Sequence, residues 1–583
     1  MSAQPDARLA GVKKVELYKQ VWNKIDRIVI FSGVVLLSWA ISWESNLVLT
    51  VTPGVTSNFG SNNLSSLLPT VLYILQTVLL PAYSKLSDNV GRAEAYSISL
   101  LFYMLAYIVM ATAQSYSTLV GGQVIYAFGY SGTSVLGPIL IGDMTTVLDR
   151  GLFQGLYNIP TLINIFVTAL VGEELLKQGQ WRWAYGMIPI LLFVASSPLM
   201  VGLWNVQFKV KRAGLLDNKK DEQQTTPKSG KYFAEKIIWF MNEIDLIGSV
   251  LMVAGLCLIL LPLVLALPRW GGWQSGITIG TLVAGVVAWI LFGIWEWKFA
   301  NKPLIPLGQW PSRTPIFGVL AVSTVTVISS TNWQFFLTYL MVSRKIGAKT
   351  AVYLERGYNV AYILMQVATG YLMKRTRVWR PFVWAGIALM ILGIGLMIPA
   401  RLPTSSDAFV VISQTIVGIG SGMLDIPILV AIQSSVPHNG RLYFVFLQRR
   451  LLNHIAFPDL AIVTALFNVG GSIAASIGST MAGTIWNNVL PEELMKNVPG
   501  DVDYSKIMGS IDYAISLPED QYQGTVVAYG HVQMILSIIA LAISVLTFLF
   551  TLPMKSFGLD QNEEKSTAVG AEAADEMIKL DKL

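Results

Sequence analysis

Long apolar runs separated by short polar stretches organise almost the whole chain. A helix rises about 1.5 Å per residue, so a run of roughly 20 apolar residues is long enough to cross a bilayer. Such a run is expected to be helical, because a helix satisfies its own backbone hydrogen bonds in lipid. The pattern predicts an all-α integral membrane protein with about 14 transmembrane helices. The predicted spans lie near 28–51, 64–83, 95–113, 117–141, 152–173, 183–206, 244–267, 275–297, 315–342, 350–373, 381–400, 407–436, 460–487 and 531–552.

The polar stretches divide these runs into two groups. Lysine and arginine gather mostly in alternate connections, which places both ends of the chain in the cytosol, because cytosolic loops carry the excess of positive charge. Six spans before and eight spans after a basic stretch favour two helical bundles with a pathway between them. The predicted order is a cytosolic tail (1–25), a first bundle of six spans (26–206), a basic cytosolic linker (207–242), eight further spans that include a second bundle (243–552), and a cytosolic tail (553–583).

Composition agrees with a membrane protein and excludes several classes of function. Of the 583 residues, 53% are hydrophobic and 13% are charged, which is about half the charged share of a soluble protein. The net charge of +6 therefore reflects loop topology, and no nucleic-acid partner is expected. The single cysteine, Cys257, and three histidines show no metal-site spacing. Neither a metal, a cofactor nor an enzyme active site is expected.

A short charged loop joins the second and third predicted spans. It comprises residues 84–92, and Asp88 and Arg92 place opposite charges at one membrane face. Gly91 permits the tight turn of an antiparallel hairpin. We expect Asp88, Gly91, Arg92 and Asp143, which lies at the inner end of the fourth span, to form a cytoplasmic latch. The alternative is a solvated turn with an isolated ion pair.

The spacing Leu-x-Asp-x-x-Gly-Arg in this loop resembles the loop between the second and third helices of the major facilitator superfamily of secondary transporters. Ser84 stands where that motif usually opens with glycine. The resemblance implies two helical bundles that rock about a central site. In such a protein the latch would break and re-form as the bundles move.

Polar residues recur at helical spacing within three of the spans. Such side chains are costly in lipid and usually face the interior of a bundle. They also bond helices to one another, and this alternative stays open for each stripe. Together with mid-span aromatic residues, they predict a cavity for a bulky, partly apolar substrate. The predicted cavity residues are Trp39, Trp43, Gln123, Tyr126, Tyr130, Asn359, Tyr362, Gln366, Gln414 and Ser421.

Three carboxylates within predicted spans are candidates for proton coupling or substrate binding: Glu44, Asp425 and Glu355. A carboxylate in apolar surroundings can bind and release a proton. Glu44 is the most conspicuous, because no basic residue lies near it in the sequence. On an ideal helix it points about 100° away from Trp43, so both reach one cavity only if the helix is wide-faced or irregular. The alternative is a carboxylate fixed to a neighbouring helix.

Three further motifs resemble the fungal siderophore–iron transporters, a branch of the superfamily with fourteen spans. They are Gly-Asp-Met-Thr-Thr at 142–146, Arg-Gly-Leu-Phe-Gln-Gly at 150–155 and Trp-Arg-Trp-Ala-Tyr-Gly-Met at 181–187. The acidic connection 488–530, expected outside the membrane, is also similar. The resemblance implies import of ferric hydroxamate siderophores by proton symport, at the plasma membrane or in endosomal vesicles, with the vacuole also possible.

Other functions of the same superfamily remain alternatives, namely haem import and glutathione or drug–proton exchange. Residues 158–172 lack the Gly-Pro element of drug–proton antiporters, which favours uptake over export. From a different class, a non-transporting nutrient receptor could share the fold. The expected partners are an iron chelate, protons and the lipid bilayer, and a monomer is expected.

Residues 439–458 do not fit the family pattern. Family members run almost directly from a segment like Val-Pro-His at 436–438 into one like that beginning at Asp459. The stretch is too short and too basic to span a membrane. We interpret it as the product of a retained intron, with an amphipathic surface segment as the alternative.

Overall fold

The computed structural model describes residues 21–144, 147–212, 241–300, 304, 313–435 and 460–556. Within these ranges, the side chains at 142–143, 147–156, 158, 433–434 and 460–465 lie outside the description. The stretch 439–458, most of the linker 207–242 and most of both tails also fall outside the described residues, so the predictions made for them stay predictions.

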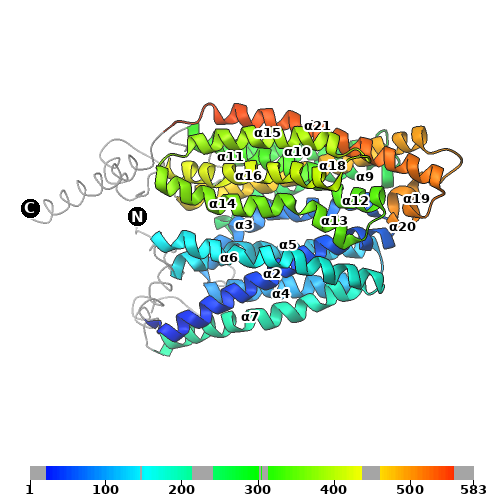
Figure 1. Cartoon of the computed structure of the whole chain (residues 1–583). Coiled ribbons are helices and arrows are strands. Elements are labelled where there is room, and N and C mark those ends of the chain that lie inside the picture. The colour runs from blue at the N-terminus through cyan, green and yellow to red at the C-terminus, as the bar shows by residue number, and fades with distance from the viewer. Residues whose placement is uncertain are drawn as a thin grey trace, which may run out of the picture. The chain divides into compact units, whose positions relative to one another are not determined.

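Contacts divide the chain into two units, whose helices are labelled in Figure 1. The first unit comprises Met1–Leu304 together with Lys345–Tyr353 and Asp503–Ser516. Within it, α2 packs against α6 and α7, and α4 packs against α5 and α7. Its helices are α2 (Lys24–Asn58), η1 (Asn62–Leu64), α3 (Leu67–Asn89), α4 (Arg92–Ala111), α5 (Tyr116–Met144), α6 (Val147–Lys177), α7 (Trp181–Arg212), α9 (Leu246–Arg269), α10 (Gly276–Lys298), α19 (Tyr504–Gly509) and α20 (Ile511–Ile515).

The second unit comprises Ile305–Arg344, Leu354–Val502 and Leu517–Leu583. In this unit α16 packs between α14 and α15, and α11 packs against α18 and α21. Its helices are α11 (Arg313–Trp333), α12 (Phe336–Arg344), α14 (Gly357–Thr376), α15 (Arg380–Ala400), α16 (Asp407–Ser434), α18 (Leu460–Asn497) and α21 (Glu519–Thr551), while α13 (Ala348–Glu355) starts in the first unit and ends in the second.

Twelve helices among the described residues are long and apolar enough to cross a membrane. The helices α14 and α18 cover the predicted spans 350–373 and 460–487 but are not among the twelve. The all-helical membrane fold is thus confirmed, whereas the count of fourteen spans stays a prediction.

The observed helices depart from the predicted spans and loops in three places. The span 350–373 is interrupted at Arg356, where α13 ends and α14 begins, and the span 315–342 is interrupted between Trp333 and Phe336. The predicted loop 84–92 is mostly helical, because α3 continues to Asn89 and only two residues separate it from α4. Apolar length indicates that a segment spans the membrane, but polar residues extend or interrupt a helix according to the partners they find.

Small residues let neighbouring helices approach closely within each unit. A Cβ atom placed on Gly129 of α5 would lie 2.4 Å from the backbone of Tyr103 in α4. One placed on Gly420 of α16 would lie 2.5 Å from the backbone nitrogen of Met390 in α15. Helices in lipid associate through such packing, because lipid tails provide little hydrophobic drive.

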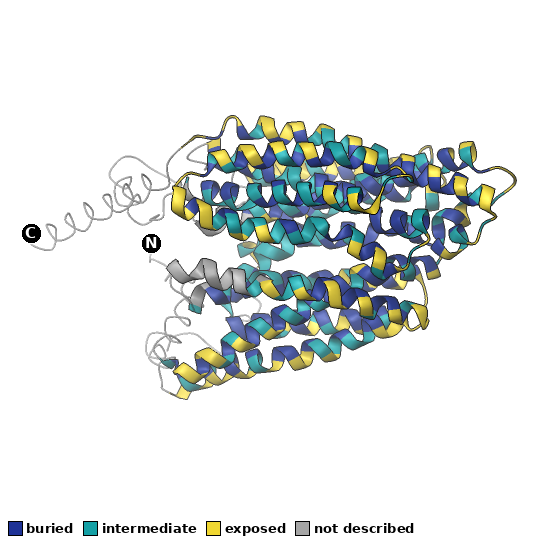
Figure 2. Cartoon of the chain, in the orientation of Figure 1, coloured by how far each residue is buried: buried dark blue, intermediate teal, exposed yellow. Residues whose placement is uncertain are grey.

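Exposed apolar side chains cover the outer faces of the helices. Figure 2 shows buried and exposed residues alternating along them. On α4 and α7, the exposed residues include Leu101 (62% exposed), Ile108 and Phe193, which line an apolar groove. An apolar outer face is expected where lipid, and not water, covers the protein.

Candidate functional site

The carboxylate of Glu44 lies at the centre of a polar cluster in the first unit. The residue is 1% exposed and belongs to the uninterrupted helix α2. Its Oε2 accepts hydrogen bonds from the Tyr103 hydroxyl (2.8 Å) and the Ser45 hydroxyl (2.9 Å), and its Oε1 accepts one from the Tyr107 hydroxyl. Within the described part of the chain, all donors to this carboxylate are therefore neutral hydroxyl groups.

Five tyrosine rings form a continuous cluster around this carboxylate. Tyr126 contacts Tyr103 and Tyr107 edge-on, with ring centroids 5.3 and 5.6 Å apart, and stacks on Tyr130 at 5.3 Å. Tyr185 of α7 stacks on Tyr107 at 6.0 Å. Edge-on and offset-stacked rings are favourable arrangements, so the cluster fixes where the phenol groups point.

The predicted residues Trp39 and Trp43 lie on the same helix as Glu44. Both are half-buried, with ring centroids 5.6 Å apart, and the indole nitrogen of Trp43 is buried without a partner among the described residues. Glu44 faces the tyrosines of α4, and α2 stays helical throughout. Gln123, also predicted, is half-buried on the helix that carries Tyr126.

Asp425 is the matching carboxylate of the second unit. It is half-buried on α16, and its Oδ2 accepts hydrogen bonds from the Tyr362 hydroxyl (3.0 Å) and the Gln366 amide (2.7 Å) of α14. Tyr362 stacks on Tyr358, which contacts Trp333 at a centroid distance of 4.5 Å. Both of these donors to Asp425 are also neutral.

The other predicted residues of the second unit are not among the hydrogen-bond donors to Asp425 described above. Glu355 is 4% exposed at the end of α13, so the helix break separates it from the polar residues Asn359, Tyr362 and Gln366, which lie on α14. Gln414 accepts from the Trp333 indole (3.2 Å) and donates to the Leu354 carbonyl (3.1 Å). Ser421 is buried, and Asn359 is half-buried.

The charged hairpin forms an ion pair within the first unit. Arg92 Nη1 lies 2.7 Å from Asp88 Oδ1 and donates to Ser87 Oγ at 2.5 Å. Gly91 has a φ of 141°, which a residue with a Cβ rarely adopts. Asp143 is the penultimate residue of α5, but its side chain lies outside the description. Its pairing with Arg92 stays a prediction.

The sequence profile of the Major Facilitator Superfamily matches residues 34–479 of this chain. The chain belongs to the Major Facilitator Superfamily. It is accordingly a multi-pass membrane transporter and not an enzyme. Membership agrees with the resemblance drawn from the spacing Leu-x-Asp-x-x-Gly-Arg at residues 86–92.

Curated relatives cover nearly the whole of this superfamily member. The siderochrome iron transporter C of Aspergillus fumigatus is 28% identical, over 97% of this chain and 89% of the relative. The siderophore iron transporter mirC of Emericella nidulans is 27% identical over 96% and 89%. The siderophore iron transporter 1 of Schizosaccharomyces pombe is 28% identical over 93% and 84%. The resemblance drawn from residues 142–187 is confirmed by these relatives.

Solved structures of other transporters share the fold. An auto-inhibited peptide transporter of the POT family matches with a TM-score of 0.55 at 14% identity, over 91% of this chain and 98% of that one. A bacterial homologue of the human lysosomal transporter Spinster matches with a TM-score of 0.52 at 11% identity, over 92% and 100%. At this identity the likeness concerns the fold alone.

The sequence pattern missed three of the five tyrosines in the ring cluster around Glu44. Tyr103 and Tyr107 recur four residues apart in one predicted span, so their shared helix face was available as a signal. Tyr185 lies within the quoted motif 181–187 but was not assigned to a site. Their convergence on Glu44 depends on how α2, α4 and α7 pack, which helical spacing does not specify.

Proposed function

We propose that this superfamily member imports ferric hydroxamate siderophores together with protons by alternating access. The observation that carries the proposal is the likeness, over nearly the whole chain, to several relatives named as siderophore or siderochrome iron transporters. The aromatic side chains near Glu44 and Asp425 suit a bulky chelate with apolar and polar parts. The iron would arrive already chelated, so no protein ligands are needed for it.

Glu44 and Asp425 are the proposed sites of proton binding. Both carboxylates accept hydrogen bonds from neutral groups, and neither forms an ion pair with a residue that the structure describes. A buried carboxylate without a cation is costly to keep charged, and the cost changes when water reaches it. Exposure to opposite sides of the membrane in turn would therefore let such a group take up and release a proton. Glu355 is the third candidate.

The ion pair Asp88–Arg92 is proposed to stabilise one conformation of the transporter. Arg92 is 7% exposed and Asp88 is 41% exposed, so the pair is partly shielded from solvent. The attraction in such a pair is stronger than in a fully exposed ion pair, and the pair can still dissociate when the helices move. The two neighbouring helices would separate more easily without it, which makes it a suitable element of a conformational latch.

Cellular location and assembly follow from the same proposal. A siderophore importer would act at the plasma membrane, and endosomal vesicles or the vacuole are alternatives. We expect the chain to act as a monomer. Haem is the second candidate substrate, because the tyrosine-rich surroundings of Glu44 would also suit a large aromatic ring system.

Uptake measurements in siderophore-transport-deficient yeast test the proposal. Radioiron is supplied as several hydroxamate chelates, with haem accumulation measured in parallel and with or without a protonophore. The chain is expressed both complete and without residues 439–458. Saturable, protonophore-sensitive uptake of one chelate is expected, and Glu44→Gln is expected to abolish accumulation. A protein that reaches the surface and accumulates haem but no chelate would refute siderophore import.

A further inference from the structure

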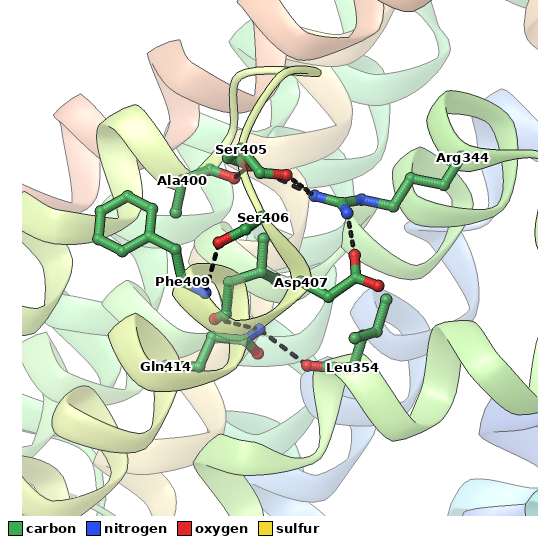
Figure 3. A network of polar contacts seen from close by, with 9 residues as sticks. Arg344, Leu354, Ala400, Ser405, Ser406, Asp407, Phe409 and Gln414 are labelled. Carbon is green, nitrogen blue, oxygen red and sulfur yellow. Dashed lines mark hydrogen bonds and ion pairs between the residues drawn. The ribbon is translucent and has the colours of Figure 1, made fainter.

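Two interrupted helices of the second unit bring buried polar groups together. The segment 313–344 is broken between Trp333 and Phe336, and the segment 348–376 is broken at Arg356. In membrane transporters, helices are interrupted where the freed groups line a site for a substrate or ion. Gln414 joins the two breaks, because it bonds the Trp333 indole at the first and the Leu354 carbonyl next to the second. Figure 3 shows Gln414 reaching Leu354.

Arg401 is the buried cation at the first break. It follows the last residue of α15 and is 1% exposed. Its Nη2 donates to the backbone oxygen and to Oδ1 of Asn332 (3.2 and 3.3 Å), and its Nε donates to Ser537 Oγ (3.4 Å). The guanidinium carbon lies 3.4 Å from the ring centroid of Phe336. All these partners are neutral, and Nη1 is buried without a partner in the described part of the chain.

Further polar atoms nearby are buried without partners. Gln533 is 0% exposed, and neither atom of its side-chain amide is bonded within the described ranges. It lies one turn before Ser537 on α21, and therefore on the helix face that Arg401 contacts. At the second break, Arg356 Nε and Nη2 and Glu355 Oε2 lack partners among the same residues.

The charges at this place do not balance. Two guanidinium groups, Arg356 and Arg401, lie within electrostatic reach of one carboxylate, Glu355. Two other sets of charges are paired with one another and do not neutralise this place: Arg344 with Asp407, as Figure 3 shows, and Glu493 with Lys496 and His531. A net positive charge with unbonded donors is unfavourable in a buried site unless an anion or a hydrogen-bond acceptor completes it.

We propose that the two helix breaks form a binding site for an oxyanion, namely a carboxylate carried by the transported iron chelate. Arg401 Nη1 and the Gln533 amide donate to the carboxylate oxygens, and Arg356 supplies the second positive charge. Glu355 serves as the counter-charge when the site is empty. This assignment rests on the proposed siderophore import and adds that the chain selects chelates with a free carboxylate over uncharged ones.

Paired uptake measurements test the selection. Two ferric trihydroxamates of the same architecture are compared, one uncharged and one carrying a free carboxylate. Arg401→Gln is expected to raise the KM for the carboxylated chelate by about tenfold or more, since a charged hydrogen bond is lost, and to change that of the uncharged chelate by less than about twofold. Arg344→Gln, which removes a guanidinium already paired with Asp407, is the matched control and should leave the ratio unchanged. An equal loss for both chelates would overturn the proposal.

A second variant covers the case in which Arg401→Gln does not fold. Gln533→Leu removes the unbonded amide and leaves no new unpaired polar group, so it should fold normally and lower the preference for the carboxylated chelate by several-fold. Unchanged preference in folded Gln533→Leu, with Arg401→Gln absent from the membrane, would count against the site.

Thermal unfolding of the purified full-length chain separates this proposal from the proposed function. Citrate is expected to raise the melting temperature of the wild-type protein and of Arg344→Gln, but not that of Arg401→Gln. If neither chelate is transported while citrate stabilises only proteins that retain Arg401, siderophore import fails and the oxyanion site stands. Equal stabilisation by chloride or phosphate would overturn the assignment to a carboxylate. No effect of any anion on stability, together with no preference in uptake, would overturn the site itself.

Discussion

Glu44 and Asp425 accept hydrogen bonds from hydroxyl and amide groups, whereas Glu355 lies near Arg356 and Arg401. The three candidate carboxylates therefore differ in the charge of their neighbouring groups. Protonation of a carboxylate surrounded by neutral donors leaves no charge unpaired. Protonation of a carboxylate that balances guanidinium groups leaves those positive charges without a counter-charge. Glu44 and Asp425 are therefore the better proton sites, and Glu355 is better suited to a permanent counter-charge.

The hydroxyl of Tyr107 is the residue-scale test of the Glu44 site. Tyr107→Phe keeps the ring stacked on Tyr185 but removes one donor to the carboxylate. Because burial without a cation makes the charged form of Glu44 costly, the loss of this hydrogen bond should lower stability by about 0.5–1.5 kcal/mol, the range for neutral partners, and slow uptake. Tyr116→Phe is the control, because the Tyr116 hydroxyl donates to a backbone carbonyl, that of Leu64, at 2.6 Å. Equal effects of both substitutions on uptake would remove the special role of the carboxylate.

Glu493 provides a pH-dependent test at a site outside the predicted spans. The hydrogen bond from Lys496 and the pairing with His531 hold the pKa of Glu493 below its ordinary value of 4.5, although burial opposes them. Because the pKa is lower in the folded state, this stabilisation is present above pH 4.5 and is lost as the pH falls below that value.

The melting temperature of Glu493→Gln is accordingly expected to be lower than that of the wild type at pH 7, with the difference shrinking in acid. The exposed neighbour Glu492 carries the same charge, and Glu492→Gln serves as the control. A difference between Glu493→Gln and wild type that stays constant from pH 7 to about pH 3 would rule out the ionic contribution.

At the scale of elements, close approach between helices depends on particular glycines. The helices α15 and α16 meet where Gly420 contacts Met390 and Gly386. A Cβ atom on Gly420 would lie 2.5 Å from Met390 N and 2.6 Å from Gly386 O, which are backbone atoms and cannot rotate away. The backbone itself must shift to make room, so the contact specifies how these two helices pack.

Gly420→Ala should therefore destabilise the protein by roughly 1–3 kcal/mol, the usual cost of overpacking. Gly395→Ala on α15 is the matched control, since a Cβ there meets nothing within 4 Å. It should be neutral or stabilising by up to about 1 kcal/mol, because glycine is a poor helix former. Thermal unfolding of the two purified variants measures both effects, and equal melting temperatures would contradict the packing argument.

At the scale of the whole molecule, the chain leaves the second unit twice to contribute segments to the first. These segments are Lys345–Tyr353 and Asp503–Ser516. The first is held by Glu173, whose carboxylate accepts the backbone N–H of Lys349 at 2.6 Å. In the second, Ile511 N donates to Ser57 Oγ at 2.8 Å. Along the chain, each segment connects two helices of the second unit. A large independent motion of these helices would therefore require the first segment to be released from α6 and the second from α2.

A disulfide between α2 and the second segment tests this coupling. Ser57 Oγ and Ser510 Oγ lie 3.3 Å apart, which is close enough for cysteines at both positions to bond. Cys257 is the only cysteine, so the double variant Ser57→Cys/Ser510→Cys is made on a Cys257→Ser background. Oxidation should stop uptake and reduction should restore it, if the segment must move during transport.

Ser57→Cys alone on the same background is the control, and it should be insensitive to oxidant. Cross-linking is followed by the protection of both thiols from alkylation. A fully cross-linked protein that transports at the normal rate would show that residues 503–516 stay attached to the first unit throughout the cycle.

Apolar length and charge distribution determined a large part of this protein from the sequence alone. Hydrophobic runs specify membrane helices locally, since each helix satisfies its own backbone. Charged residues stand out against these apolar runs. The hairpin at Asp88–Arg92, between two runs, and the buried carboxylate Glu44, within one, were therefore predictable. Tyr126 and Tyr130 were predicted through their shared helix face, and the structure places both in the ring cluster around Glu44.

Tertiary structure alone decided which polar groups meet. The convergence of Tyr103 and Tyr107 on Glu44, and of Tyr362 and Gln366 on Asp425, depends on contacts between different helices. Arg401 lies between the predicted spans 381–400 and 407–436, where a loop was expected. In the structure it is buried by contacts with α11, α12 and α21. A sequence period describes one helix at a time, whereas burial and hydrogen bonding depend on the neighbours that packing supplies.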